Sequence, residues 1–369
     1  MNLNSSFTNI LGRYLLSRLL RLDFLLLAIV LVITTIGFLT LFSAGYSFPW
    51  RIEGQIRNLI VAAFTMMIVA SLPLKWIEKA AMPAFLCGCL LLLATELFGV
   101  TVKGATRWLN LGIRIQPSEI MKLAAPMMLA WYYHRRGAEL CQWDHLLAVA
   151  VLLIPVAFIL KQPDLGTAIL VGIAGFAVIF FSGISLKILA VTGIAGMLSL
   201  PVLWNFLHDY QRERILTLID PTRDPLGKGF HTLQAQIAIG SGGISGKGWM
   251  EGTQAHLDFI PERTSDFIFA VFGEEFGFIG SLILLILYAA LVYRCFFIAL
   301  QSSNLFGKLL ASAIGVIFFT YAFVNIGMVS GILPVVGVPL PFMSYGGTAL
   351  LILGIATGIL LAVAAESHD

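Results

Sequence analysis

The sequence predicts an all-α polytopic membrane protein of about ten transmembrane helices, with one long polar loop between the seventh and the eighth. Of its 369 residues, 59% are hydrophobic and 12% are charged, and the mean hydropathy is +0.92, which soluble domains do not reach. The apolar residues gather into runs of roughly 20, the length that crosses a hydrocarbon core. The net charge of +3 is too small to indicate nucleic-acid binding.

The expected spans follow one another through short turns, except at the polar loop of residues 206–265. At the joint between the fifth and sixth spans, Pro163 stops one helix and Asp164 is a plausible N-cap of the next. Within the N-terminal segment 1–22, residues 10–22 place Arg13, Ser17 and Arg21 at helical spacing among leucines and predict an interfacial helix without a cleavable signal peptide. All 369 residues are expected to form a single domain. The spans are 23–43, 56–72, 80–99, 117–133, 145–161, 164–182, 186–205, 266–293, 306–330 and 343–365.

Basic residues near the span ends predict that the N-terminus lies inside. Among the short loops, those on the N-terminal side hold more Lys and Arg than those on the other side. An even number of spans then returns the C-terminus to the inside and places the long loop outside. That loop is itself basic, which opposes the rule and indicates an anionic partner on the outer face.

The long loop re-enters the membrane through an acidic stretch, residues 258–266. It holds three carboxylates, Asp258, Glu262 and Asp266, together with Arg263, and an apolar run follows at once. Ionisable groups at such a position are costly, so the stretch is a candidate functional site. The alternative is that Asp266 only caps the helix that follows, because Asp is a favoured N-cap residue.

A second polar segment, residues 102–119, precedes the fourth span and contains Arg107, Trp108 and Arg114. Glu119 and Lys122 are three residues apart on one helix face and are expected to pair within the membrane. A purely structural salt bridge is an equally good interpretation of that pair. Trp108 is also typical of the aromatic belt at a membrane surface.

Three further polar features lie along the chain. The glycine-rich residues 240–249 lack the ending and the context of a phosphate loop, although their amides are able to form an anion-binding nest. Glu274 and Glu275 fall inside the eighth span and must find partners or become protonated. Residues 338–347 form a proline-interrupted segment before the tenth span, which predicts irregular backbone beside protein or a cavity.

Six motifs in one order show that the whole chain resembles the SEDS family of shape, elongation, division and sporulation proteins, and its rod-shape branch more than its division branch. The motifs are Lys-Gly-Ala-Thr-Arg-Trp-Leu from residue 103, Gln-Pro-Ser-Glu from 116, Gln-Pro-Asp-Leu-Gly-Thr from 162, Gly-Ser-Gly-Gly from 240, Pro-Glu-Arg-Thr-Ser-Asp-Phe-Ile-Phe from 261 and Pro-Phe-Met-Ser-Tyr-Gly-Gly from 341.

The resemblance implies a ten-helix peptidoglycan glycosyltransferase that polymerises lipid II, the undecaprenyl-pyrophosphate-linked disaccharide-pentapeptide. The reaction would serve cell elongation and rod shape on the periplasmic face of the bacterial inner membrane, with both termini cytoplasmic. The implied partners are a class B penicillin-binding protein, which cross-links the glycan, and other membrane proteins of the elongation complex.

The resemblance also implies roles for single residues. The essential aspartate of the family falls on Asp266 and its loop tryptophan on Trp108. The membrane-edge glutamate and lysine fall on Glu119 and Lys122, with Arg114 just before them. Relatives commonly carry His-Thr before the aspartate, where this chain has Thr-Ser at 264–265, so a histidine role does not carry over.

The chemistry of such a reaction points to one carboxylate and several cations. A pyrophosphate is already a good leaving group, so the demanding step is deprotonation of the attacking sugar hydroxyl, for which we expect Asp266 to be the base. Glycosidases need two carboxylates because their leaving alcohol must be protonated, whereas cations are able to stabilise a departing pyrophosphate. The residues expected to bind substrate are Lys122, Glu119, Arg114, Arg107, Trp108, Glu262 and Arg263.

Two points stay open. A divalent cation such as Mg²⁺ or Mn²⁺ would assist the leaving group, but no ligand cluster is specific enough to assign one. A lipid II flippase would also use polar groups among ten helices, and a non-catalytic scaffold would leave the acidic stretch unexplained. The carboxylates and cations gather on one side, which favours the enzyme and predicts a cavity that opens outward, wide enough for two lipid-linked sugars.

Overall fold

The structure is a computed structural model that describes residues 21–102, 105–110, 112, 114–206, 212, 216, 218, 228–257, 260 and 262–367. The predicted interfacial helix at 10–22 falls outside the described residues except for its last two positions. Asp258 and most of the first half of the long loop also fall outside them.

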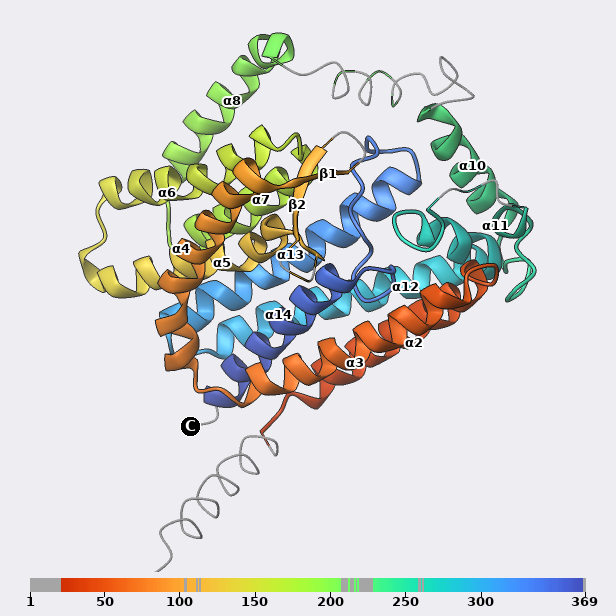
Figure 1. Ribbon diagram of the computed structural model, residues 1–369. Coiled ribbons are helices and arrows are strands. Elements are labelled where there is room, and N and C mark those ends of the chain that lie inside the picture. The colour runs from red at the N-terminus through yellow and green to blue at the C-terminus, as the bar shows by residue number, and fades with distance from the viewer. Residues whose placement is uncertain are drawn as a thin grey trace, which may run out of the picture.

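The described part of the chain contains ten helices of 17 or more residues, and Figure 1 shows that they form a bundle from which the helix of residues 186–206 stands apart at the top of the view. Each corresponds to one predicted span, which confirms the all-α polytopic fold. The largest differences are at α3, which begins seven residues before the predicted start at 56, and at α12, which ends eight residues after the predicted end at 293. The helices are α2 (Phe24–Ala44), α3 (Pro49–Ser71), α4 (Leu74–Phe98), α5 (Pro117–Arg136), α6 (Gln142–Lys161), α7 (Leu165–Phe181), α8 (Leu186–Phe206), α12 (Ile268–Gln301), α13 (Leu305–Val329) and α14 (Gly347–Glu366).

Seven of these described helices are long and apolar enough to cross a membrane: α2, α3, α4, α6, α12, α13 and α14. Helix α7 has only 17 residues, and α5 carries Glu119, Lys122 and a basic last turn. Most of α5 is nevertheless buried by its neighbours, so protein rather than lipid surrounds its polar groups. The chain is therefore a multi-pass membrane protein, and its most polar long helix, α5, is shielded by the others.

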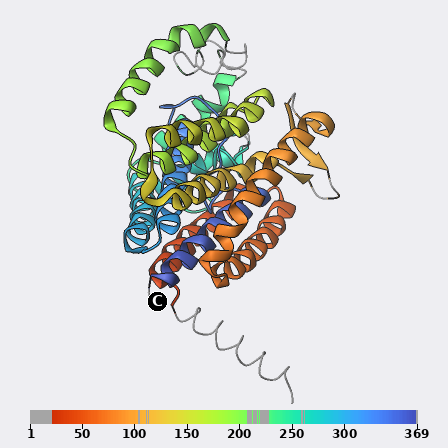
Figure 2. The ribbon, with the colours of Figure 1, turned by 90° about the vertical axis from the view of Figure 1, so that its left-hand side faces the viewer.

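Helices α13 and α14 form the centre of the bundle. In the most apolar 18-residue stretch of each of them, 72% of the residues are buried, against 17% in α3, which therefore lies at the edge. Helix α14 packs against α3, α12 against α13, and α5 against α4 and α7, and Figure 2 shows α14 (blue) beside α3 (orange). Gly354 permits the close approach of α14 and α3, because a Cβ there would lie 2.7 Å from the carbonyl oxygen of Ala62.

Polar caps begin several helices and tie them to their neighbours. Asp23 accepts a hydrogen bond from the Leu26 amide at 2.9 Å and pairs with Arg294 of α12 at 2.8 Å. Asp164 caps α7 through the Thr167 amide at 3.2 Å, which confirms the predicted N-cap. Such caps satisfy amides at helix starts that would otherwise lack partners.

A small antiparallel sheet covers the end of the bundle where α5 and α7 begin. Its strands are β1 (Val100–Val102), β2 (Ala105–Asn110) and β3 (Arg114–Ile115), in the order β1-β2-β3. Val100 pairs with Trp108, and Leu109 pairs with Ile115. The sheet packs on α4 and α5 and brings Arg107 and Trp108 over the bundle. From the sequence, only a polar segment was predicted here.

Helix α12 is broken at Gly277, whose φ of 65° and ψ of −160° are not helical. The long loop fills the break through the turn that follows α10 (Lys228–Ser241) and precedes α11 (Thr253–His256). The amides of Lys247 and Gly248 donate to the carbonyls of Glu274 and Glu275, both at 3.0 Å. The glycine-rich residues 240–249 thus replace helix hydrogen bonds that the break removes, rather than forming an anion-binding nest.

Candidate functional site

A polar cavity of about 280 Å³ lies at the end of the bundle that the sheet covers. It brings together five of the predicted site residues from three distant segments: Asp266, Lys122, Glu119, Arg107 and Trp108. Its other polar or aromatic lining residues are Gln116, Asp164, Thr167, Tyr345 and Thr348. Residues 336–339, which follow α13, form a further wall.

Asp266 lies immediately before α12 and is half-buried. The N-cap of α12 is Phe267, and among the described residues no side chain caps this helix, so the interpretation of Asp266 as a mere cap is wrong. Gly337 closely approaches the carboxylate, because a Cβ at Gly337 would lie 3.3 Å from Asp266 Oδ2. At this point, therefore, the cavity wall is bare backbone.

The backbone before α12 is fixed by three consecutive hydrogen bonds. The carbonyl oxygen of Thr264 accepts from the Tyr345 amide at 2.8 Å, and that of Ser265 accepts from Ser344 Oγ at 2.7 Å. The carbonyl oxygen of Asp266 accepts from an amide group on α13 at 2.9 Å. The segment that carries Asp266 is thus bonded both to the motif before α14 and to the centre of the bundle.

Glu119 and Lys122 form the predicted pair on α5, with Lys122 Nζ 2.5 Å from Glu119 Oε1. Both residues are buried. Lys122 Nζ also lies 2.6 Å from the hydroxyl oxygen of Tyr321 on α13 and 4.9 Å from the centre of its ring. Tyr321 was not predicted from the sequence, because an aromatic residue in an apolar span carries no signal of such a contact.

Arg107 reaches from β2 to the turn between α6 and α7. Its NH2 group donates to the carbonyl oxygen of Pro163 at 2.5 Å, and NH1 lies 3.8 Å from Asp164 Oδ2. Asp164 is buried and also accepts from Gln116 Nε2 at 3.3 Å. From the sequence, Asp164 was predicted only as a helix cap, although its Gln-Pro-Asp-Leu-Gly-Thr motif was a usable signal that it belongs to the site.

Three predicted binding residues do not line the cavity. Arg263 is buried, and its Nε donates to the carbonyl oxygen of Ala44 at 2.7 Å. Its guanidinium lies 5.4 Å from the centre of the Phe48 ring, so it braces the turn between α2 and α3. Glu262 is exposed and accepts from Ser265 Oγ at 3.1 Å, and Arg114 is exposed on β3.

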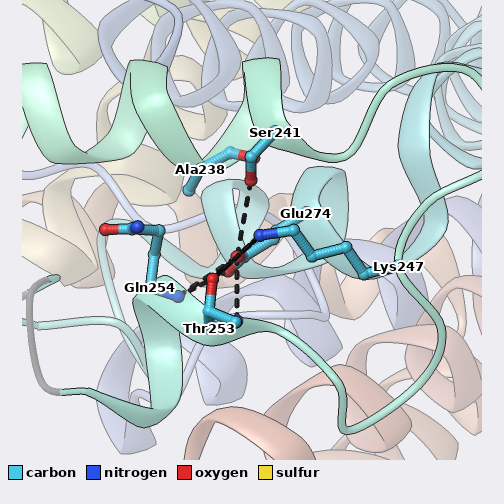
Figure 3. A network of polar contacts seen from close by, with 6 residues as sticks. All are labelled: Ala238, Ser241, Lys247, Thr253, Gln254 and Glu274. Atoms are coloured by element: carbon cyan, nitrogen blue, oxygen red, sulfur yellow. Dashed lines mark hydrogen bonds and ion pairs between the residues drawn. The ribbon is translucent and has the colours of Figure 1, made fainter.

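A second buried polar cluster surrounds Glu274, away from the cavity lining (Figure 3). Glu274 is 0% exposed, and its Oε1 lies 2.6 Å from Lys247 Nζ. The same oxygen accepts from the Thr253 amide at 2.9 Å and from the Gln254 amide at 3.1 Å. Neighbouring Glu275 accepts from the Ser43 hydroxyl. Both carboxylates thus accept hydrogen bonds inside the span, and the contacts of Glu274 fasten the long loop to α12.

The donor set of the cavity does not resemble a resident metal centre. Within the described ranges, no group of three or more His, Cys, Asp or Glu side chains is placed to hold an ion. The cavity carboxylates Glu119, Asp164 and Asp266 come from separate elements, and the first two contact Lys122 and Arg107.

Comparisons with known proteins agree with this architecture. Residues 16–369 match the model of the FtsW/RodA/SpoVE family, described as cell cycle proteins. The peptidoglycan glycosyltransferase MrdB (RodA) of Escherichia coli K12 is 44% identical over 344 residues, which cover 93% of each chain. The probable peptidoglycan glycosyltransferase FtsW of Trichlorobacter lovleyi is 33% identical and covers 94% of each.

Solved structures of relatives show the same fold. One of them is a chain from a peptidoglycan synthase complex, described as showing the structural coordination of polymerization and crosslinking. It aligns with a TM-score of 0.82 at 32% identity, and the alignment covers 94% of this chain and 99% of that one. The rod-shape-determining protein RodA of Thermus thermophilus aligns with a TM-score of 0.72 at 28% identity, covering 94% and 98%. The resemblance inferred from the six motifs is confirmed, and the chain belongs to the FtsW/RodA/SpoVE family of cell cycle proteins.

Proposed function

We propose that this protein is a peptidoglycan glycosyltransferase that polymerises lipid II during cell elongation and the maintenance of rod shape. The relatives named above as peptidoglycan glycosyltransferases support the activity. The observation that carries the proposal is the single cavity in which Asp266 meets Lys122 and Arg107, although these residues come from three different segments.

In the proposed reaction, Asp266 acts as the general base. It accepts the proton of the acceptor sugar hydroxyl while that oxygen attacks the anomeric carbon of the donor sugar. The bond between this carbon and the pyrophosphate oxygen breaks, and the pyrophosphate leaves on its lipid. The half-buried carboxylate faces a wall without a side chain at Gly337, which leaves room for a hydroxyl to approach. Proton transfer to a positioned base contributes about 10²–10⁴ to a rate.

Arg107 and Lys122 divide the stabilisation of the leaving group. The Arg107 side chain is 30% exposed, and its ion pair with Asp164 is long, at 3.8 Å. Part of its guanidinium is therefore accessible, and we assign it the direct contact with pyrophosphate. Lys122 is held by Glu119 and Tyr321, and it contributes positive charge from the buried side of the cavity. These steps use the cations of the chain itself, and none of them depends on a divalent ion.

The cavity must widen before it holds substrate. Pockets for small ligands measure about 300–1,000 Å³, and at 280 Å³ this cavity is smaller. The prediction of a cavity wide enough for two lipid-linked sugars is therefore wrong for this conformation. The sheet and residues 330–346 are the non-helical walls, and we propose that they move apart on binding.

The cavity end is proposed to face the periplasm, with both termini in the cytoplasm, as the basic residues of the short loops indicate. A class B penicillin-binding protein and other membrane proteins of the elongation complex are the proposed partners. The relative described as part of a synthase complex that coordinates polymerisation with crosslinking supports the first of these.

A flippase is the less favoured function. The opposite end of the bundle does carry a charged hollow of about 340 Å³, lined by Lys75, Glu78, Lys79, His134 and Arg135. On α5, which joins the two ends, the fully buried side chains between Lys122 and His134 are apolar or aromatic, from Leu123 to Tyr133. The described residues of this helix thus offer no polar path between the two hollows.

The test is polymerisation of lipid II by the purified protein with its partner in detergent, where there is no second leaflet to flip to. Asp266→Asn should insert and fold normally and lose about 10²–10⁴ in rate. Glu251→Gln changes an exposed carboxylate outside the cavity and should keep the wild-type rate. Polymerisation by Asp266→Asn at a near-normal rate would remove the proposed base.

A further inference from the structure

A single amide side chain on α13 joins two walls of the cavity. Asn325 is 0% exposed, and its Nδ2 lies 2.9 Å from the carbonyl oxygen of Asp266 and 2.6 Å from that of Val338. An amide nitrogen carries two hydrogens, so both are used, one on each wall. Asp266 and Val338 themselves line the cavity.

The origin of this contact sets it apart from the other two bonds that fix the same backbone. The partners of Thr264 and Ser265 are Tyr345 and Ser344, which belong to the non-helical segment before α14. Asn325 instead lies within the regular helix α13 at the centre of the bundle. Among the described contacts of the Thr264, Ser265 and Asp266 carbonyls, the bond from Asn325 is the one that fixes the position of Asp266 relative to a long regular helix.

We infer that Asn325 is a positioning residue, which holds the Asp266 carboxylate at its working distance from the wall formed by residues 336–339. This inference rests on the proposed role of Asp266 as the base. The base must lie within hydrogen-bond reach of the hydroxyl, and a displacement of 1 Å costs about 10² in rate. Because Asn325 bonds both walls, its loss removes the bond of each wall to α13. Among the described contacts, the carboxylate and the facing Gly337 are then linked through Ser344, which accepts from the Leu340 amide and donates to the carbonyl oxygen of Ser265.

The number of donors at this position provides a graded test. Asn325→Leu keeps a similar size and removes both donors. Asn325→Asp keeps the shape and, protonated because burial disfavours its charge, retains one donor. The expected order of kcat for lipid II polymerisation is wild type, then Asn325→Asp, then Asn325→Leu, with Asn325→Leu slower by about 10–100-fold. The KM should stay within about twofold, because the lost interaction acts in the transition state.

A matched control separates positioning from stability. Thr320→Val removes another buried polar group of α13, whose hydroxyl donates to Val316 of the same helix at 2.7 Å. Thermal unfolding of each variant is measured beside its kinetics, and Thr320→Val should keep both kcat and KM. If Asn325→Leu does not fold, Asn325→Ser, with one hydroxyl donor, takes its place, and the intermediate loss expected of a one-donor variant should again be confined to kcat.

Three results would overturn the inference: a wild-type kcat in folded Asn325→Leu or its substitute, a loss confined to KM, or an equal kcat loss in Thr320→Val. If Asp266→Asn is inactive while Asn325→Leu is fully active, the inference alone fails. If Asp266→Asn is active, the proposed function loses its base, and the two failures are therefore distinguishable.

Discussion

Removal of the Lys122 charge should destabilise the protein strongly, and removal of both charges of the pair should not. The Lys122 and Glu119 side chains are 3% and 9% exposed, and Nζ lies 2.5 Å from Oε1. The other oxygen of Glu119, Oε2, is buried and has no hydrogen-bond partner in the described part of the chain. In Lys122→Met the carboxylate therefore keeps its burial and loses its cation, which costs about 3–5 kcal/mol.

The reverse single change should cost less. In Glu119→Gln, Lys122 retains the Tyr321 hydroxyl at 2.6 Å and the face of its ring at 4.9 Å. Loss of one charged hydrogen bond then costs about 1.5–3 kcal/mol. The double variant replaces the buried ion pair with neutral side chains of similar volume, a change that is often neutral in stability. The expected order of stability is wild type and double variant together, then Glu119→Gln, then Lys122→Met.

Two assays on the same purified samples decide this. Samples are heated in detergent, and the fraction of protein that stays folded is measured by size-exclusion chromatography, which gives the order of stability. Lipid II polymerisation shows whether the charge also acts in the reaction, and we expect the double variant to fold but to lose at least about 10² in rate. A double variant less stable than Lys122→Met would refute the electrostatic reasoning. A stable and fully active double variant would make the pair purely structural.

Two other predictions concern the long loop and the orientation of the chain. Lys247→Met should lower stability by about 3 kcal/mol, the low end for a broken buried pair, because backbone amides still bond Glu274. Lys247→Arg should recover most of this stability in the same heating assay. A Lys247→Met variant as stable as the wild type would contradict the role of the cluster. The orientation is tested with Ser265→Cys in a chain whose Cys87, Cys89 and Cys295 are replaced by alanine. Ser265→Cys should react with an impermeant thiol reagent added from the periplasmic side. Native Cys141, exposed at the opposite end of the bundle, is the matched control and should react only from the cytoplasmic side; the reverse pattern would refute the orientation.

The ten long helices were predictable because each contains an apolar run, and lipid requires that the backbone bond itself within such a run. The break in α12 was not, because Gly277 is one glycine among many and its conformation depends on hydrogen bonds exchanged with residues 243–248. The sheet was missed for a similar reason. Its strands have only two to six residues, too few for an alternating pattern to be recognised.

The candidate site divides along the same line. Asp266, Glu119 and Lys122 were found because charge is rare and costly in an apolar span. Asn325 and Tyr321 were missed because their roles exist only once α13 packs beside α5 and α12. Arg263 was assigned to the substrate because it is close to Asp266 in sequence, whereas its side chain reaches the carbonyl oxygen of Ala44. Closeness in sequence says little about which wall of a bundle a side chain faces.

The burial of α5 follows from the charge that it carries. A charged side chain is costly in a spanning helix, by about 2.5–3.5 kcal/mol for a lysine at its centre and less toward its ends, so a helix with both Glu119 and Lys122 would be a poor span by itself. Here α4, α7 and α13 surround α5, and Lys122 finds Glu119 on its own helix and Tyr321 on α13. The helix that carries the cavity cation is therefore stable only inside the assembled bundle. This explains why α5, although more polar than α3, is far more deeply buried.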